Sequence, residues 1–279
     1  MSRLSRREFL KAGAGLTTAA GLAGFYALFV ERYLIKANHY TIVLDRLPPA
    51  FDGFTILQLT DLHYGFLMPL WLIERVIFQA NHTEKDITVC TGDYVHERNS
   101  HQAIDEIWPV MHRLRAPLGV YSVLGNHDNW ADPERSSYWL QHSGQNLRQK
   151  VRLFERDGQR LWLGGTGDLW TEHPVIDEVF AGVPWNDCKI LLAHNPDTAD
   201  RSFRTEIDLM ISGHTHGGQV RLPLVGAPVL PVENKRYSSG LIDTPRLKLF
   251  ISRGIGWTGY PVRVNCPPEI AVLTLRSAK

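Results

Sequence analysis

The chain has 279 residues, of which 44% are hydrophobic and 21% charged, and this balance excludes a disordered or low-complexity protein. The formal net charge is +1 and the lysines and arginines are dispersed, apart from a cluster at the N-terminus. We therefore expect no nucleic-acid partner. The three cysteines, Cys90, Cys188 and Cys266, form no C-x-x-C pair, which excludes a disulfide framework and a zinc ribbon.

Residues 1–35 are interpreted as a targeting segment and not as part of the folded domain. A basic stretch at residues 5–11 precedes an uncharged run at residues 12–30, an arrangement typical of export signals. Arg6 and Arg7, followed by Phe-Leu-Lys, resemble a bacterial twin-arginine signal, so the twin-arginine export machinery is an expected partner. An amphipathic helix is the alternative, but the uncharged run shows no polar face.

Two fates remain open for this segment. The run at residues 12–30 is 19 residues long, near membrane-spanning length, and no small-x-small cleavage site follows it, which favours an uncleaved membrane anchor. Its glycine and alanine content makes it a weak span, so cleavage stays open. Either fate places residues 36–279, predicted to form one domain, in the periplasm or at the outer face of the cytoplasmic membrane.

The first half of this domain alternates predicted strands and helices. Apolar and β-branched runs predict strands at residues 54–59, 86–90 and 119–124. Helical spacing predicts helices between them, at residues 69–81 and 101–114. Two successive strand–helix–strand units indicate parallel strands at the centre of an α/β fold.

The second half is richer in strands. Asp157-Gly158 lies between two apolar runs and predicts the turn of a hairpin. Two sheets stacked face to face, with helices outside, would accommodate both halves. The strands expected here are residues 151–154, 160–165, 189–193, 207–211, 247–251 and 270–275.

Five of the predicted strands are each followed at once by acidic, amide or imidazole residues. Because the carboxyl ends of strands form the binding crevice of an α/β sheet, these segments should converge on one place. Neighbouring glycines permit tight turns off the strand ends. The residues are Asp61 and His63, then Asp93, then Asn126, His127 and Asp128, then His194, and finally His214 and His216.

These residue types suit divalent cations. Asp, Asn and His together favour manganese, iron, zinc or a mixed pair. In Asp61-x-His63 and His214-x-His216 the paired residues point to the same side of an extended segment, so each pair can reach one site. Two cations that share a carboxylate can hold a bridging hydroxide and neutralise the oxygens around phosphorus. The pattern predicts a two-metal phosphoesterase.

The five blocks, in this order between about residues 54 and 275, resemble the calcineurin-like metallophosphoesterases. The resemblance implies a four-layer α/β/β/α sandwich of two mixed sheets. It also implies which residues bind the two metals. They are Asp61, His63 and His216 for the first metal, Asn126, His194 and His214 for the second, and Asp93 as the bridge.

The resemblance implies two further roles. His127 would lie over the phosphate and stabilise charge or protonate the leaving oxygen. Asp128 would orient His127 from behind. Residues 165–170, 193–197 and 235–237 resemble a subgroup of phosphodiesterases that are exported by the twin-arginine route.

The predicted function is a phosphodiesterase at the outer face of a bacterial cytoplasmic membrane, with a phosphate-ester substrate that the anchor suggests is lipid-linked. A UDP-2,3-diacylglucosamine-type pyrophosphatase is an alternative, but it needs the cytoplasmic face and conflicts with the export signal. A monoesterase is another alternative, which relative activity on mono- and diesters would decide. A non-catalytic metal-binding membrane protein is disfavoured, because every ligand position is filled.

Other residues are expected to lie outside the site. Arg236 could meet a phosphate oxygen, but a solvated loop arginine is favoured. The proline-rich residues 223–231 could line a groove for a hydrophobic substrate, rest on the membrane or simply pack as a long loop. Seven histidines are interpreted as surface or packing residues: His39, His82, His96, His101, His112, His142 and His173.

Overall fold

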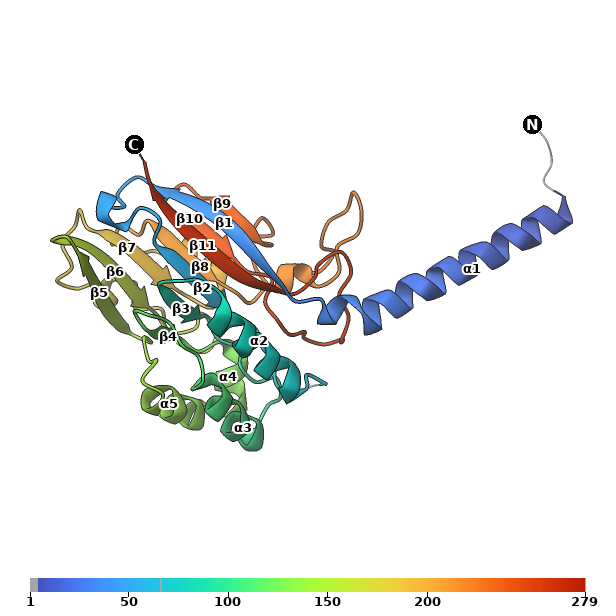
Figure 1. The fold of residues 1–279 in the computed structure, drawn as a ribbon, viewed down its shortest axis with the longest axis horizontal. Coiled ribbons are helices and arrows are strands. Elements are labelled where there is room, and N and C mark those ends of the chain that lie inside the picture. Colours follow the sequence, from blue (N-terminus) through green and yellow to red (C-terminus); the bar gives the residue numbers. More distant parts are fainter. Residues whose placement is uncertain (1–4, 66, 279) are drawn as a thin grey trace.

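Two mixed β-sheets pack face to face in the computed structural model, which describes residues 5–65 and 67–278 (Figure 1). The first sheet runs in the order β1 (Lys36–Leu44), β11 (Glu269–Ser277), β2 (Thr55–Leu59), β3 (Ile87–Cys90) and β4 (Val120–Ser122). The second runs in the order β5 (Lys150–Arg156), β6 (Gln159–Gly165), β7 (Cys188–Leu192), β8 (Leu209–Ser212), β10 (Lys248–Ile251) and β9 (Gly240–Asp243).

Parallel strand pairing places the carboxyl ends of the central strands of both sheets at the same end of the molecule. In the first sheet β2, β3 and β4 are parallel, and β11 runs antiparallel to β2. In the second, β6, β7, β8 and β10 are parallel, while β5 forms the predicted hairpin with β6 around Asp157-Gly158. The carboxyl ends of the five strands that precede polar blocks therefore lie at one end of the sandwich.

Alternation along the strands fills the space between the sheets. Ile56 of β2 and Leu273 of β11 belong to one buried cluster with Leu163 of β6 and Ile190 of β7. The intervening residue Leu57 faces the other way, into a second cluster beneath the helices. Because side chains alternate between the two faces, a shift of one residue would move the buried side chains to the wrong face, and this fixes each strand's register.

Helices and loops cover the outer faces. α2 (Leu70–His82) and α3 (His101–Met111) cover the first sheet, and α4 (Asn126–Ala131) and α5 (Pro133–His142) follow β4 (Figure 1). Short elements, α6 (Ile176–Val179) and the 3₁₀ turn η3 (Pro196–Asp200), help to cover the second sheet. The layer order α/β/β/α is confirmed, with a thin fourth layer.

Every strand and helix predicted above exists, but the structure adds others. β1 was not predicted because only Ile42 and Leu44 of its nine residues are buried, and its apolar run is limited to the three residues Ile42-Val43-Leu44. β9 is a half-exposed edge strand, and the short helices α4 and α5 follow β4 where only a polar block was recognised.

The N-terminal helix α1 (Arg6–Phe29) projects away from the sandwich (Figure 1). Ser5 caps it, accepting a hydrogen bond from the Glu8 amide while the Glu8 carboxylate accepts one from the Ser5 amide. Of its residues only Ala27 is buried. The helix is long and apolar enough to cross a membrane by length and composition. Residues 1–4 of the predicted leader lie outside the described residues.

Candidate metal centre

Five of the predicted ligands have left-handed backbone conformations. The φ angles are 54° at Asp61, 49° at His63, 56° at Asp93, 71° at His214 and 52° at His216. Such conformations cost of order 1 kcal/mol or more for residues other than glycine, and they cluster at functional sites. They turn the chain sharply off the strand ends, so that neighbouring side chains gather at one point.

The close approach of these turns requires glycine at two positions. A Cβ on Gly92 would lie 2.3 Å from the Gly125 nitrogen, and one on Gly213 would lie 2.2 Å from Thr60 Oγ1 and 2.3 Å from Asp61 Oδ2. Gly92 also has a φ of 95°. Both glycines therefore let loops from different strands touch, which brings their ligands together.

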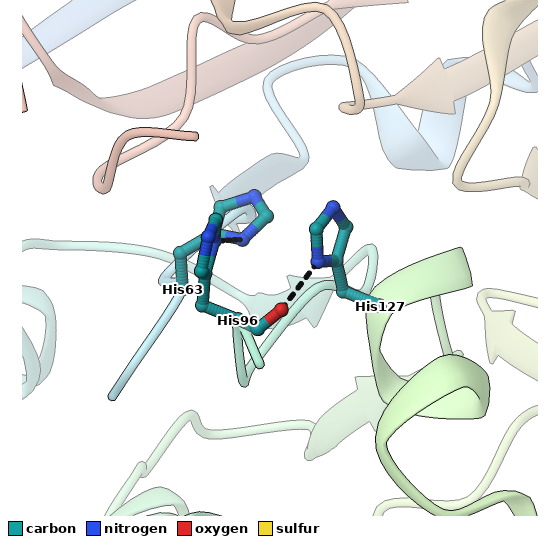
Figure 2. Close-up of side chains that lie close together, drawn as sticks. All are labelled: His63, His96 and His127. Carbon is teal, nitrogen blue, oxygen red and sulfur yellow. Dashed lines mark hydrogen bonds between the residues drawn. The ribbon is translucent and has the colours of Figure 1, made fainter. Parts of the chain in front are cut away.

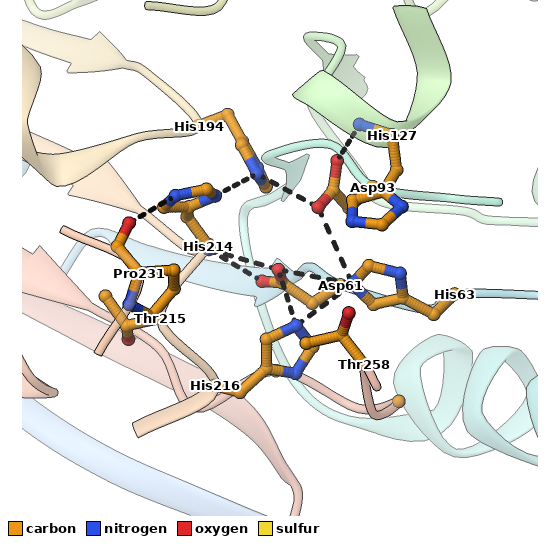
Figure 3. A network of polar contacts seen from close by, with 12 residues as sticks. Asp61, His63, Asp93, His127, His194, His214, Thr215, His216, Pro231 and Thr258 are labelled. Atoms are coloured by element: carbon orange, nitrogen blue, oxygen red, sulfur yellow. Dashed lines mark hydrogen bonds and ion pairs between the residues drawn. The ribbon is translucent and has the colours of Figure 1, made fainter. Parts of the chain in front are cut away.

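The first group of ligands consists of Asp61, His63 and His216, all buried (Figure 3). The Nε2 atoms of His63 and His216 lie 2.9 Å apart. Asp61 Oδ1 lies 3.4 Å from His216 Nε2 and 3.9 Å from His63 Nε2. The three donor atoms can therefore converge on one cation.

The second group consists of Asp93, His194 and His214 (Figure 3). His194 Nε2 lies 3.2 Å from Asp93 Oδ2 and 3.1 Å from His214 Nδ1. The same Asp93 oxygen is 3.5 Å from His63 Nε2 in the first group. Asp93 thus stands between the groups, where a bridging carboxylate has to be.

The outer nitrogens of the second group are fixed by the main chain. His194 Nδ1 donates to the Thr91 carbonyl at 2.7 Å, and His214 Nε2 donates to the Pro231 carbonyl at 2.8 Å. Each bond determines the tautomer and leaves the inner nitrogen as the potential ligand atom.

Asn126 adds an oxygen that nothing in the chain satisfies. Its side chain is buried and its Oδ1 has no hydrogen-bond partner among the described residues. The adjacent His127 amide donates to Asp93 Oδ1 at 2.9 Å, so Asn126 lies beside the second group. A buried acceptor without a partner is costly, and a cation would satisfy it. The residues therefore fit a pair of divalent metals.

Burial and charge oppose each other in this cluster. Burial alone would raise the pKa values of Asp61 and Asp93, but the surrounding imidazoles outweigh it and hold both carboxylates well below their usual range. Burial alone would lower the pKa of His194, but Asp93 raises it to about 10. Burial, followed by the charge of His194, lowers the pKa of His214 to about 4. The carboxylates are therefore ionised and able to bind cations at neutral pH.

His96 lies beside the predicted ligands, in a group that could hold a metal, and its interpretation as a surface or packing residue did not anticipate this position (Figure 2). Its Nδ1 lies 3.2 Å from His63 Nδ1, and its ring stacks on His127 with centroids 5.1 Å apart. Its carbonyl accepts a hydrogen bond of 2.7 Å from His127 Nδ1. Its place three residues after Asp93, on the same loop, was the available signal.

Asp128 lies close to His127 in sequence but does not orient its ring, which corrects the role expected for it. Its carboxylate accepts hydrogen bonds from the amides of Asp93, Tyr94 and Gly125 at 2.8, 2.8 and 2.9 Å. Burial, followed by the charge of Asp93, raises the pKa of Asp128 to about 7. Asp128 therefore holds the loop that carries Asp93, while the His96 carbonyl orients His127.

Arg263, which no sequence pattern singled out, lies behind the first group. It is fully buried, and its guanidinium donates to the carbonyls of His216, Arg253, Gly256 and Cys266. Arg236, by contrast, is exposed, as expected of a loop arginine. Arg263 ties His216 to the segment that contacts Asp61, because a Cβ on Gly254 would lie 2.7 Å from Asp61 Cβ.

Comparisons with known proteins agree on one family. Residues 54–218 match the family described as calcineurin-like phosphoesterase. The chain is 33% identical to the uncharacterised metallophosphoesterase YkuE of Bacillus subtilis, over 99% of both chains. It is 33% identical to phosphodiesterase YaeI of Escherichia coli, over 98% of this chain and 99% of YaeI. It is 28% identical to a bovine transmembrane protein with a metallophosphoesterase domain, over 85% of this chain and 56% of that protein.

Proposed function

Because the chain belongs to the calcineurin-like phosphoesterase family and is a metal-dependent phosphoester hydrolase, we propose that it is a two-metal phosphodiesterase at the outer face of a bacterial cytoplasmic membrane. One observation carries the two-metal part of this proposal. Two groups of buried donors, each able to hold a cation, meet at the single carboxylate of Asp93.

The ligand assignment follows the two groups. The first metal would be held by Asp61, His63 and His216, and the second by Asn126, His194 and His214, with Asp93 shared. Divalent ions held there would activate water and neutralise the oxygens of a phosphate ester. Their identity, among manganese, iron, zinc or a mixed pair, is left open by this donor set.

His127 is the residue of the chain that would handle the leaving oxygen. Donation from its Nδ1 to the His96 carbonyl makes Nε2 the nitrogen available to a substrate oxygen. Burial lowers its pKa, so the free imidazole is neutral at pH 7. A bound phosphate places negative charge beside this ring and favours the protonated form, which is the form that a general acid needs.

The diester preference is supported by the similarity to phosphodiesterase YaeI. Helix α1 supports a location at the membrane, either as an anchor or as an export signal that is later removed. We propose that residues 1–35 act as a twin-arginine signal or anchor and that residues 36–279 form the catalytic domain. The anchor would favour a lipid-linked phosphate ester as substrate.

The test compares hydrolysis of bis(p-nitrophenyl) phosphate and p-nitrophenyl phosphate by the full chain in detergent with added manganese. Metal content per chain is measured alongside. Asp93→Asn should abolish diester turnover and lower the metal content, whereas Asp243→Asn, at an exposed aspartate paired with Lys248, should change neither. A folded sample that binds two metals yet cleaves neither ester would contradict the phosphodiesterase and favour a pyrophosphatase or a metal-binding role.

A further inference from the structure

Exposed apolar side chains surround the base of α1. Leu224, Val225 and Val229 are 108%, 69% and 73% exposed on the loop at residues 219–231, and Tyr260 is 78% exposed on the loop at residues 257–266. Soluble surfaces rarely concentrate apolar side chains in this way without a partner. We propose that these four residues form a docking face that inserts into the lipid bilayer that α1 enters.

Hydrogen bonds attach the docking face to α1. The Arg221 amide donates to the Val264 carbonyl at 2.8 Å, and the Val264 amide donates to the Gln219 carbonyl at 2.9 Å. The preceding residue, Arg263, donates its amide to the carbonyl of Ala27 in α1 at 3.3 Å. The loop that bears Leu224 is therefore fixed beside the helix, as Figure 1 also shows.

The junction between helix and domain has the composition of a membrane interface. Tyr33 stacks on Trp71 with centroids 6.3 Å apart, and Trp71 is 56% exposed. Arg32 lies 4.7 Å from the ring centroids of Tyr33 and Trp257, and its guanidinium donates to the Pro261 carbonyl next to Tyr260. Aromatic rings and arginines are favoured where a spanning helix leaves the hydrocarbon, because their polar parts reach the headgroups.

The bilayer is the occupant that this position favours. The loop at residues 219–231 projects from the same end of the sandwich as α1 in Figure 1, so a membrane that takes in the helix down to its base would lie against the loop tip. Leu222 and Gly226 close the turn around Leu224 through a 2.8 Å hydrogen bond, which presents that side chain outward. A protein partner would have to compete with lipid for the same space.

The docking face also adjoins the metal centre. Pro231 ends the loop and accepts the hydrogen bond from the predicted ligand His214, while Gln219 begins it directly after the turn that contains His216. The site therefore lies beside the lipid headgroups once the face is inserted. This inference rests on membrane insertion of α1, as set out in the proposed function.

Spin labelling of the full chain in nanodiscs of phosphatidylethanolamine and phosphatidylglycerol tests the inference. The three native cysteines are buried, so single cysteines can be introduced and labelled selectively. Leu224→Cys and Tyr260→Cys carry the test, and Leu118→Cys, 42% exposed before β4 at the other end of the sandwich, is the matched control. Leu16→Cys, within α1, reports insertion of the helix itself.

We expect labels at residues 224 and 260 to collide severalfold more with oxygen, relative to a water-soluble nickel chelate, than the label at residue 118. Nickel access equal to that at residue 118, with residue 16 protected, would overturn the docking face alone. Nickel access at residue 16 as well would overturn the anchor and the inference that rests on it. Spin–spin broadening at residue 224 would show a second copy on the face and also overturn the inference.

Discussion

The two ends of the β-sandwich differ in the partners of their carboxylates. At the end away from the site, cations and carboxylates pair with each other near the surface: Arg46 with Asp208, Arg160 with Asp187 and Arg276 with Asp52. At the site end, Asp61 and Asp93 are buried and receive no bond from a lysine or arginine side chain within the described residues 5–65 and 67–278.

This contrast indicates that the far end is stabilised by contacts within the chain, whereas the site end depends on bound metal ions. At the far end, the three carboxylates named above are already neutralised by arginines of the chain itself. The site end combines left-handed backbone, crowded imidazoles and buried carboxylates whose charged neighbours are histidines, and bound cations would offset the free-energy cost of this arrangement. Changes at the two ends should therefore have separable effects on function and on stability.

Metal removal should have the largest effect. Saturating metal should raise the free energy of unfolding by about 4 kcal/mol for each site when the free metal is about 1,000 times its dissociation constant. Thermal unfolding with and without chelator measures this, together with loss of diester hydrolysis. An unfolding temperature that is the same with and without chelator would mean that bound metal does not stabilise the site end.

His127→Ala should lower the activity of the site while leaving its metal binding unchanged. His127 touches the cluster through its ring but is not a predicted ligand, so two metals should remain bound. Diester hydrolysis should fall by about 10² to 10⁴-fold, the loss expected for a general acid. Steady-state rates and metal content measure the two effects, with His142→Ala, on the exposed end of α5, as the control. Metal loss together with activity would make His127 a ligand.

The metal-free protein should lose stability in alkali. The charge of Asp93 raises the pKa of His194 to about 10, above its ordinary value of 6.5. A raised folded-state pKa contributes stability that is complete below pH 6.5 and is lost as pH rises through about 10. Urea unfolding of wild type and His194→Asn across this range, in chelator, measures the difference. Parallel pH profiles for the two proteins would refute the pairing of His194 with Asp93.

Arg46→Met should have the smallest effect. Arg46 Nε lies 2.8 Å from Asp208 Oδ1 with a quarter of its side chain exposed, so the pair is worth about 1 kcal/mol of unfolding free energy. Metal content and diester hydrolysis should be unchanged, because the pair lies at the far end. Urea unfolding measures the loss, and a fall in activity at full metal content would show that the two ends are coupled.

Much of the architecture follows from local patterns in the sequence. Apolar runs located the central strands, and the polar blocks after five of them predicted convergence at one edge. The structure brings these predicted residues together, with Asp93 between two groups of donors. Metal binding itself remains a prediction that the assays above address.

The parts that were missed depend on contacts made after the chain folds. His96 looks like any loop histidine until the turn at Asp93 sets its ring on His127. Asp128 bonds amides of a loop 33 to 35 residues earlier, which no sequence spacing reveals. Arg263 contradicts the ordinary preference of arginine for the surface, because main-chain carbonyls satisfy its guanidinium in the interior.

The strand order has a consequence for synthesis. β11 is made after every other strand of the described residues, yet it lies between β1 and β2, the earliest of these strands. Its first residue, Glu269, bonds Asn38 and Tyr40 of β1 and the amide of Arg253, one residue before Gly254 packs on Asp61. A nascent chain therefore keeps the facing edges of β1 and β2 unpaired until β11 has been made. The metal pocket can take its final shape only after β11 has emerged and paired with both strands.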